Sequence, residues 1–292
     1  MNAFTIKDLE NLSGVKAHTI RIWEQRYSFI KPQRTGTNIR YYSNEELKTI
    51  LNIALLNRYG YKISHIDKMD TRELEERIQN LAAVHAKQES VLNQLISHMV
   101  EMEIDDFDDV LSGYIAAHGI DKTIMDVIFP FLEKVGILWQ TNHIYPAQEH
   151  LVTNVIRQKL VVGIENVSNN WRSDKLVLLY LPENEFHELG LLYVNYLLKK
   201  RGVRSLYLGA SLPLKDLEVV VKMKNPLYLH THLTSVAHNF NLEKYMNQLH
   251  QRIPDVPVII SGPVTHDYKK SVPANISFKS TLAEVMAGIE NI

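Results

Sequence analysis

Strand and helix patterns alternate along residues 175–289, and this alternation constrains the fold more than any other feature of the 292-residue chain. The apolar run Leu-Val-Leu-Leu-Tyr-Leu, within residues 175–181, is typical of a strand buried in a parallel sheet. The pattern predicts a doubly wound, Rossmann-like parallel sheet, whose ligands bind at the carboxyl ends of the strands. Further strands are predicted at 205–208, 227–233, 256–261 and 276–279, and helices at 189–200, 213–223, 242–252 and 282–289.

The loop after the first predicted strand carries a candidate binding site. It contains Glu185, His187 and Gly190, and the fold rule places it beside the ligand crevice. Glu185 can orient the imidazole of His187 or set its tautomer. Gly190 permits close packing, or close approach of a ligand, at the start of the next helix. From this pattern alone, an ordinary loop His and a ligand-binding His are equally good interpretations.

Helical spacing dominates the middle of the chain and predicts a four-helix bundle. Trp139 and the pair Glu149–His150 flank the connection between its last two helices, where they can shape the lid of a pocket. A packed Trp beside a surface Glu-His pair is the ordinary interpretation of the same residues. The predicted helices lie at about 83–98, 103–118, 121–136 and 146–168.

Acidic residues gather where the second of these helices begins. Carboxylates there interact favourably with the helix dipole, so we favour a solvated helix start. Oxygen ligands for a hard metal cation are the alternative. The residues are Glu101, Glu103, Asp105, Asp106, Asp108 and Asp109.

The run from Phe4 to Tyr42 is organised as a helix-turn-helix. Thr5 is the expected N-cap of the first helix, and Gly14 permits the turn that follows it. A basic loop then leads to a short strand at 40–42, which adds a wing and predicts DNA binding. The apolar residues at helical spacing are Ile6, Leu9, Val15, Ile20 and Trp23. Further helices are predicted at 43–59, 63–69 and 71–85.

Polar side chains of the second helix and of the wing are the candidate contacts to DNA. The first turn of such a helix reaches base edges, whereas Arg21, Arg26 and Tyr27 can hold phosphates. A cationic wing contacts the flanking backbone. The outward face of the helix presents His18, Thr19, Arg21, Glu24, Gln25 and Arg26, and the wing adds Lys31, Arg34, Thr35, Asn38, Arg40 and Tyr41.

Composition narrows the functional classes. Hydrophobic residues make up 45% of the chain, so a large core can be buried. There is no Cys, which excludes disulfides, thiolate nucleophiles and Cys-ligated metals. No signal segment and no apolar run of ~18 residues is present, so we expect a cytoplasmic protein that does not engage membranes. Residues 1–70 carry 11 Lys/Arg against 7 Asp/Glu, and the remainder carries 21 against 26, which fits a DNA-contacting head on an acidic body.

The head resembles a known family. The pattern Thr19-Ile20-Arg21-x-Trp23-Glu24-x-Arg26-Tyr27, followed by Arg34 and Asn38-x-Arg40-Tyr41-Tyr42, is similar to the winged-helix head of MerR-family transcription regulators over residues 4–69. The resemblance implies a homo-oligomer, dimer or tetramer, on double-stranded pseudo-palindromic promoter DNA, with RNA polymerase as a further partner. MerR proteins often dimerise through a long helix after the head, for which this chain offers only residues 71–85.

The remainder resembles cobalamin-binding proteins. Glu185-x-His187-x-x-Gly190 is similar to the base-off cobalamin motif, in which the His is the lower axial ligand of cobalt. Trp139, nine residues and Glu149-His150 resemble the helical cap that lies against the upper ligand of adenosylcobalamin. The resemblance therefore implies cobalamin, in the adenosyl form, as the cofactor.

The order of domains resembles that of the light-sensing, cobalamin-dependent MerR regulators over essentially the whole chain. It implies a DNA-binding head at 1–80, a four-helix cap at 81–170 and a Rossmann-like domain at 171–292. In that family, the positions of His230 and Ser261-Gly262 line the slot for the nucleotide tail of cobalamin. We therefore expect a regulator, not an enzyme, that senses cobalamin and couples it to oligomerisation and promoter binding.

Three positions depart from the family pattern and keep alternatives open. His230 and Ser261 replace small residues, and Gln140 stands where light-sensing members have a His. One alternative is a MerR-type regulator whose Rossmann module has lost the cofactor and serves protein interaction or oligomerisation. Another is a corrinoid enzyme or methyl carrier, against which the DNA-binding head and the missing substrate domain both argue.

Overall fold

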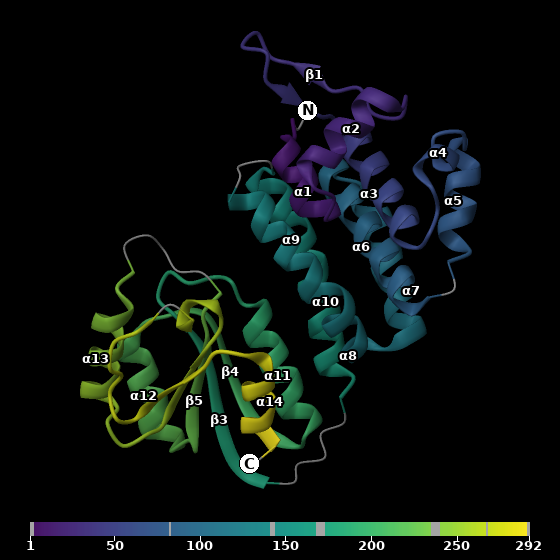
Figure 1. Cartoon of the computed structure of the whole chain (residues 1–292). Helices are drawn as coiled ribbons and strands as arrows, with labels where there is room; N and C mark the ends of the chain where they lie inside the picture. The colour runs from purple at the N-terminus through teal and green to yellow at the C-terminus, as the bar shows by residue number, and fades with distance from the viewer. Residues whose placement is uncertain are drawn as a thin grey trace. The chain divides into compact units, whose positions relative to one another are not determined.

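The computed structural model describes residues 3–81, 83–140, 144–167, 173–234, 240–266 and 268–290 (Figure 1). The chain divides into two units, 1–156 and 157–292, and the boundary falls within helix α10 (Pro146–Glu165). Each unit is described by itself. The division at residues 80 and 170 that the sequence suggests stays a prediction. Within the described ranges, none of the helices has the length and apolar character that crossing a membrane requires.

The first unit begins with a winged helix-turn-helix. Thr5 caps the first helix, its Oγ1 accepting from the Asp8 backbone N–H at 3.3 Å, and Gly14 ends it with φ 74°, as predicted. Phe4 and Tyr42 form a buried bridge between the amino terminus and the end of the wing. The elements are α1 (Ile6–Ser13), α2 (Ala17–Arg26), β1 (Gln33–Arg34), β2 (Arg40–Tyr41), α3 (Asn44–Arg58), α4 (Ile63–Ile66) and α5 (Thr71–Gln79).

The predicted helix over 71–85 is wrong in its extent. α5 ends at Gln79, and a separate helix begins at Val84. The chain turns between them because the Leu81 N–H donates to the Ile78 carbonyl and both side chains are buried. The segment therefore packs onto the head and does not form a long projecting helix.

A four-helix bundle follows, as predicted. Its helices are α6 (Val84–Glu101), α7 (Ile104–His118), the continuous run of α8 (Ile120–Thr123), η1 (Ile124–Ile128) and α9 (Phe129–Gln140), and α10. Phe107 and Phe131 pack in its core with ring centroids 5.4 Å apart. The segment η1 is a π-helix, and Pro130 follows it closely. Since Pro has no N–H and clashes with the carbonyl four residues back, the wider turn relieves that contact.

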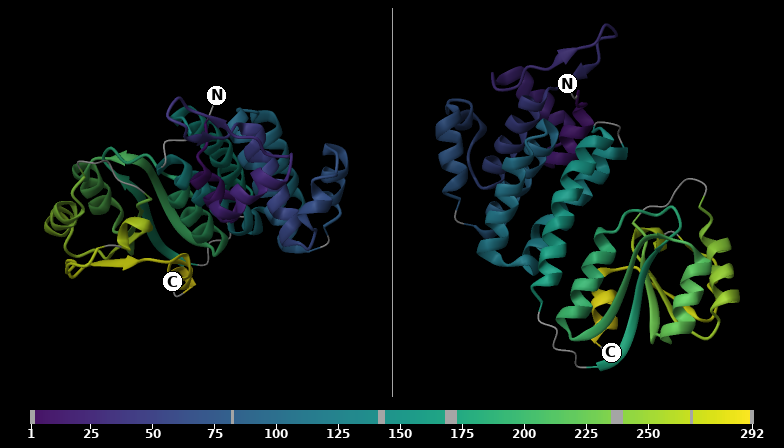
Figure 2. Two further views of the ribbon diagram at one scale, coloured as in Figure 1. Left: turned by 45° about the horizontal axis from the view of Figure 1, so that its top comes forward. Right: turned by 180° about the vertical axis from the view of Figure 1, so that it is seen from behind.

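The second unit contains the predicted doubly wound sheet. Five parallel strands lie in the order β4-β3-β5-β6-β7. Helices α11 and α14 cover one face and α12 and α13 the other (Figures 1 and 2). The strands are β3 (Ser173–Pro182), β4 (Val203–Leu212), β5 (Tyr228–His232), β6 (Val258–Ser261) and β7 (Ile276–Lys279). The helices are α11 (Leu189–Lys200), α12 (Leu214–Lys224), α13 (Leu242–Arg252), α14 (Leu282–Glu290) and the short 3₁₀ turn η2 (Pro263–Thr265).

The two faces of β5 differ in chemistry. Leu229 packs into an apolar core with Leu217 of α12 and Met246 of α13. The alternate residues His230 and His232 point to the opposite face, where His232 meets Gly190 of α11. A buried strand in a parallel sheet normally reads as continuously apolar, so two His on one face mark a place where packing alone does not explain the sequence.

Candidate functional site

The recognition helix α2 separates buried apolar from exposed polar residues as predicted. Ile20 and Trp23 are buried, and Trp23 makes an edge-on contact with Phe29 at 6.0 Å between centroids. On the other side, His18, Arg21, Gln25 and Arg26 are exposed, whereas Thr19 and Tyr27 are half-buried. The exposed residues have the polar and cationic character that base edges and phosphates require.

Glu24 departs from its predicted outward position. Its side chain is only 7% exposed, and it accepts from Nε of Arg40 at 2.9 Å and from the hydroxyl of Tyr42. Burial, together with the Glu24 carboxylate, raises the pKa of the Tyr42 hydroxyl. Glu24 therefore ties the base of the wing to α2, a contact across 16 residues that helical spacing does not reveal.

The tip of the wing is exposed and internally braced. Nη1 of Arg34 donates to Oδ1 of Asn38 at 2.8 Å, and Asn38 occupies the left-handed region with φ 66°. The hydroxyl of Tyr41 donates to Oε1 of Gln33 at 2.5 Å. Ile39 is 60% exposed beside them. The wing thus holds its predicted DNA contacts on one short hairpin.

Two cations from other helices cap the carboxyl end of α1. Nζ of Lys134, from α9, donates to the Leu12 carbonyl at 2.6 Å, and Nη2 of Arg58, from α3, donates to the Ser13 carbonyl at 2.9 Å. Burial lowers the pKa of Lys134. The Lys134 bond joins the helix-turn-helix to the bundle within the first unit. Neither contact follows from the sequence pattern, because the partners lie far apart in sequence.

The predicted lid residues lie on α9 and α10. Trp139 is 47% exposed, so the ordinary interpretation of a packed Trp is wrong. Oε1 of Glu149 accepts from the Thr153 hydroxyl at 2.9 Å, and its Oε2 lies 3.5 Å from Nε2 of the exposed His150. The side chain of Gln140 lies outside the described parts of the chain.

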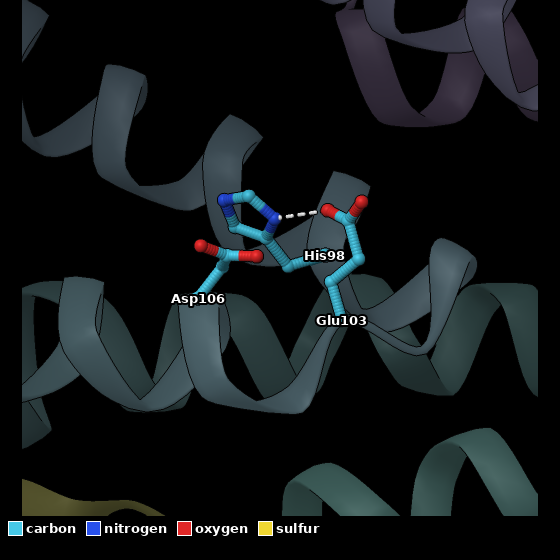
Figure 3. Close-up of side chains that lie close together, drawn as sticks. All are labelled: His98, Glu103 and Asp106. Carbon is cyan, nitrogen blue, oxygen red and sulfur yellow. Dashed lines mark hydrogen bonds and ion pairs between the residues drawn. The ribbon is translucent and has the colours of Figure 1, made fainter.

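One part of the acidic cluster approaches a His (Figure 3). Nδ1 of His98 donates to Oε2 of Glu103 at 2.8 Å, and Asp106 completes a group whose potential ligand atoms lie within 4.8 Å of one another. Glu103 and Asp106 are exposed. An ion pair at the junction of α6 and α7, where the Glu103 N–H also donates to the His98 carbonyl, accounts for this arrangement.

In the second unit, His187 is held as the sequence predicts. Glu185 is buried, and its Oε1 accepts from both Nδ1 and the backbone N–H of His187, at 2.6 and 2.8 Å. The Ser211 N–H donates to the Glu185 carbonyl at 3.0 Å and fixes the loop to the end of β4. The imidazole is 55% exposed, and with Nδ1 engaged, Nε2 is the nitrogen that would bind a metal.

The start of α11 is fixed by a further acid. Oε2 of Glu188 accepts from the Tyr207 hydroxyl at 2.6 Å, and Oε1 pairs with Nε of Arg157 at 2.5 Å. Burial and the Glu188 carboxylate raise the pKa of Tyr207. Glu185 and Glu188 are thus both anchored, which limits the positions that the imidazole of His187 can take.

The two predicted glycines are required by close approach. An added Cβ on Gly190 would lie 2.1 Å from Cδ2 of His232, and one on Gly262 would lie 2.4 Å from the Leu233 carbonyl oxygen. Gly262 also has φ 102°, in the left-handed region. The partner of Gly190 is a side chain that the sequence analysis did not single out.

His230, Ser261 and His232 form one hydrogen-bonded group, in which His230 and Ser261 are buried and His232 is half-buried. Nε2 of His230 and Nδ1 of His232 each lie 2.9 Å from Oγ of Ser261. Burial lowers the pKa of His230 to about 3 and that of His232 to about 4, so both imidazoles are neutral at pH 7. Within the described part of the chain, Nδ1 of His230 is buried without a hydrogen-bond partner.

Comparison with known proteins agrees with the description of the head and of the four-helix bundle. Residues 4–73 match the MerR HTH family of regulatory proteins, and residues 91–162 match the B12 binding domain. The HTH-type transcriptional repressor CarH of Myxococcus xanthus is 28% identical over 273 residues, 91% of each chain. The repressor CarA of the same organism is 28% identical over 216 residues, 73% of this chain and 70% of its own.

A solved structure supports the fold. The monomethylamine corrinoid protein of Methanosarcina barkeri has a TM-score of 0.57 at 15% identity, over 70% of this chain and 100% of that one. The matched domains, together with the similar repressors, define a DNA-binding transcription regulator. In particular, the chain combines a MerR-type helix-turn-helix with a B12-binding domain, which confirms the resemblance drawn from its motifs.

His187 fits a corrinoid as a cobalt ligand, whereas His232 takes up space next to it. His187 has the exposure and the oriented imidazole that an axial cobalt ligand needs. His232, by contrast, fills the space over Gly190. The imidazole of His187 is therefore oriented as a metal ligand would be, whereas His232 occupies the space over Gly190.

Proposed function

We propose that this chain is a MerR-type repressor whose promoter binding responds to cobalamin held by His187. The observation that carries the proposal is the Glu185–His187 pair, at the carboxyl end of β3, in a chain with a MerR head. The names of the two relatives, both transcriptional repressors, support the sign of regulation. The expected location is the cytoplasm, where promoter DNA is reached.

The DNA-binding surface comprises α2 and the wing. His18 and Thr19, in the first turn of α2, are assigned to base edges, since that turn of a recognition helix enters the major groove. The remaining residues are assigned to phosphates and sugars: Arg21, Arg26, Tyr27, Arg34, Asn38 and Tyr41. Arg40 is assigned to positioning, because Glu24 engages it. Two heads on a pseudo-palindrome require a homo-oligomer, and RNA polymerase is a further partner at such a promoter.

On the ligand side, His187 is assigned as the residue that would hold cobalt through Nε2, with Glu185 fixing its tautomer. Cobalamin, when bound, would supply a cobalt ion that an imidazole can ligate. Trp139, Glu149 and His150 are assigned to the upper ligand, which the resemblance implies to be adenosyl; the exposure of Trp139 agrees with this role. His230 and Gly262 are assigned to the wall of the crevice.

Coupling between the sites follows from linkage. A ligand shifts only the state that it binds better, so cobalamin must favour one oligomeric or DNA-binding state. Within the first unit, α9 carries Trp139 near its end. The same helix carries Lys134, which donates a hydrogen bond to the Leu12 carbonyl at the carboxyl end of α1. This helix offers a rigid connection between a ligand-facing residue and the helix-turn-helix.

The test is retention of corrinoid by the full chain. Protein incubated in the dark with adenosylcobalamin and desalted should keep a corrinoid with an imidazole-bound visible spectrum, and His187→Ala should lose it. His250→Ala, which removes a half-buried imidazole that bonds to Asn275, is the matched control and should retain the ligand. Failure of the wild-type chain to retain any corrinoid would favour a cofactor-free module for protein interaction or oligomerisation.

A further inference from the structure

His232 lies where the topology of the sheet directs a ligand. The chain passes from β3 to β4 on one side and then crosses to β5 on the other, so β3 and β5 flank the switch point. His187 follows β3, His232 ends β5 and Ser261 ends β6. All three therefore lie at the carboxyl edge, where ligands of such sheets bind.

His232 leaves no room for another group over the start of α11. Its imidazole contacts the backbone of Gly190 so closely that even a Cβ there would lie 2.1 Å from Cδ2 and 2.4 Å from Nε2. The next boundary is equally tight, since a Cβ on Gly262 would meet the Leu233 carbonyl at 2.4 Å. At both glycines, this chain's own atoms occupy the space against the backbone.

Hydrogen bonds hold His232 in that position. Ser261 Oγ has one hydrogen to donate and two lone pairs, and it lies 2.9 Å from both His232 Nδ1 and His230 Nε2. Two neutral imidazoles, each with one N–H and one acceptor nitrogen, satisfy this hydroxyl as one donor and one acceptor. Moving His232 away from Gly190 would break its bond to the buried Ser261 hydroxyl, which is costly.

The chemistry of cobalamin makes this filling consequential. When a protein imidazole takes the lower axial position of cobalt, the nucleotide base of cobalamin is displaced but stays tethered to the same face of the corrin ring. That face is the one presented to His187, so the base must be housed beside it or be left in water. In this chain, the adjacent space is occupied by His232.

We propose, resting on the corrinoid function above, that the protein prefers corrinoids without a lower nucleotide base, the cobinamide class, and that His232 sets this preference. Exclusion acts through shape, because His232 penalises the ligand that carries the extra group. His187 serves both ligands, and His232 distinguishes them.

The experiment compares adenosylcobinamide with adenosylcobalamin on the full chain, by titration calorimetry and visible spectra in the dark. The wild-type protein should bind adenosylcobinamide at least about tenfold more tightly. His232→Ala should bring the two affinities together by strengthening the binding of adenosylcobalamin about tenfold while leaving that of adenosylcobinamide unchanged. His250→Ala should keep the wild-type ratio, and Ser261→Ala, which frees both imidazoles, should shift it part of the way.

The outcomes separate this proposal from the function on which it rests. Wild-type protein that binds adenosylcobalamin as tightly as adenosylcobinamide, with an imidazole-bound spectrum, would overturn the preference and leave the corrinoid function standing. An unchanged ratio in a folded His232→Ala protein would overturn the role of His232. Binding of neither corrinoid would overturn both proposals together.

Discussion

In the head, Glu24 draws Arg40 back against the recognition helix, whereas in the Rossmann-like domain Glu185 presents His187 to the surface. Both carboxylates are buried, and each engages a residue that the sequence marks for ligand binding. The Arg40 side chain is 31% exposed and the His187 side chain 55%. A buried carboxylate can therefore either hold a functional side chain against the protein or orient it towards solvent. The exposure of the paired side chain distinguishes the two cases.

The largest effect should come from removing the imidazole of His187, which Glu185 orients towards solvent. His187→Ala should weaken binding of adenosylcobinamide by at least about 100-fold, since the metal loses its protein ligand, and Glu185→Gln should cost about tenfold because the imidazole loses its orientation. Titration calorimetry of both variants measures the two losses. Equal losses would mean that Glu185 does more than orient the ring.

Removing the carboxylate of Glu24, which holds Arg40 against the recognition helix, should instead reduce the stability of the wing. Glu24→Ala leaves Arg40 and the Tyr42 hydroxyl without their shared acceptor, and we expect it to destabilise the wing by about 2 kcal/mol. Hydrogen exchange of peptides over residues 33–42 in the full chain reports this change. Protection equal to that of the wild type would show that Glu24 does not anchor the wing.

His230 and His232 make the free energy of unfolding of the second unit depend on pH. The pKa values of about 3 and about 4 lie below the usual 6.5, so the unfolded chain binds protons that the folded chain does not. Stability from each His is therefore complete above pH 6.5 and is lost as the pH falls towards the folded values.

As the pH falls from 6.5 to 5, each His should lower the free energy of unfolding of the domain by about 2 kcal/mol. His232→Gln should remove one of these two contributions. Hydrogen exchange of the β5 and β6 peptides across this range measures the loss. Parallel pH profiles for wild type and His232→Gln would contradict the burial of a neutral imidazole at this position.

The comparison also shows where sequence reasoning succeeds. The sequence predicted both bounds of α11 and of α13 correctly, and the strand at 276–279, because apolar periodicity is local information. It predicted the Glu185–His187 pair for the same reason, since only one residue separates the partners. Side-chain geometry within a short loop follows from the loop itself.

The missed contacts all cross long stretches of sequence. Glu24 faces inward because Arg40 and Tyr42 return to it from the wing, and Lys134 reaches a carbonyl 122 residues away. His232 occupies the space over Gly190 because α11 packs over β5. None of these follows from periodicity, since each depends on which element the fold places opposite.

The connection through Lys134 should have a modest energetic effect and a specific functional one. Lys134→Met removes the donor to the Leu12 carbonyl, and we expect about 1 kcal/mol less stability at the junction of α1 and α9. Promoter affinity without ligand should stay near that of the wild type, while its change on adding corrinoid should shrink. Full retention of the corrinoid response, measured by fluorescence anisotropy of promoter DNA, would exclude this route.

The smallest effect distinguishes Arg21, an exposed candidate for a phosphate contact, from Arg40, which pairs with Glu24. Arg21 is exposed on α2, so Arg21→Ala should reduce the slope of log affinity against log salt by about 0.9, one phosphate contact. Arg40→Ala should weaken DNA binding by disordering the wing yet keep a slope closer to that of the wild type, because Nε of Arg40 is committed to Glu24. Salt titrations of promoter binding for both variants decide the matter: equal reductions in slope would show that Arg40 reaches the DNA backbone in the complex, and that the carboxylate in the head releases its partner on binding.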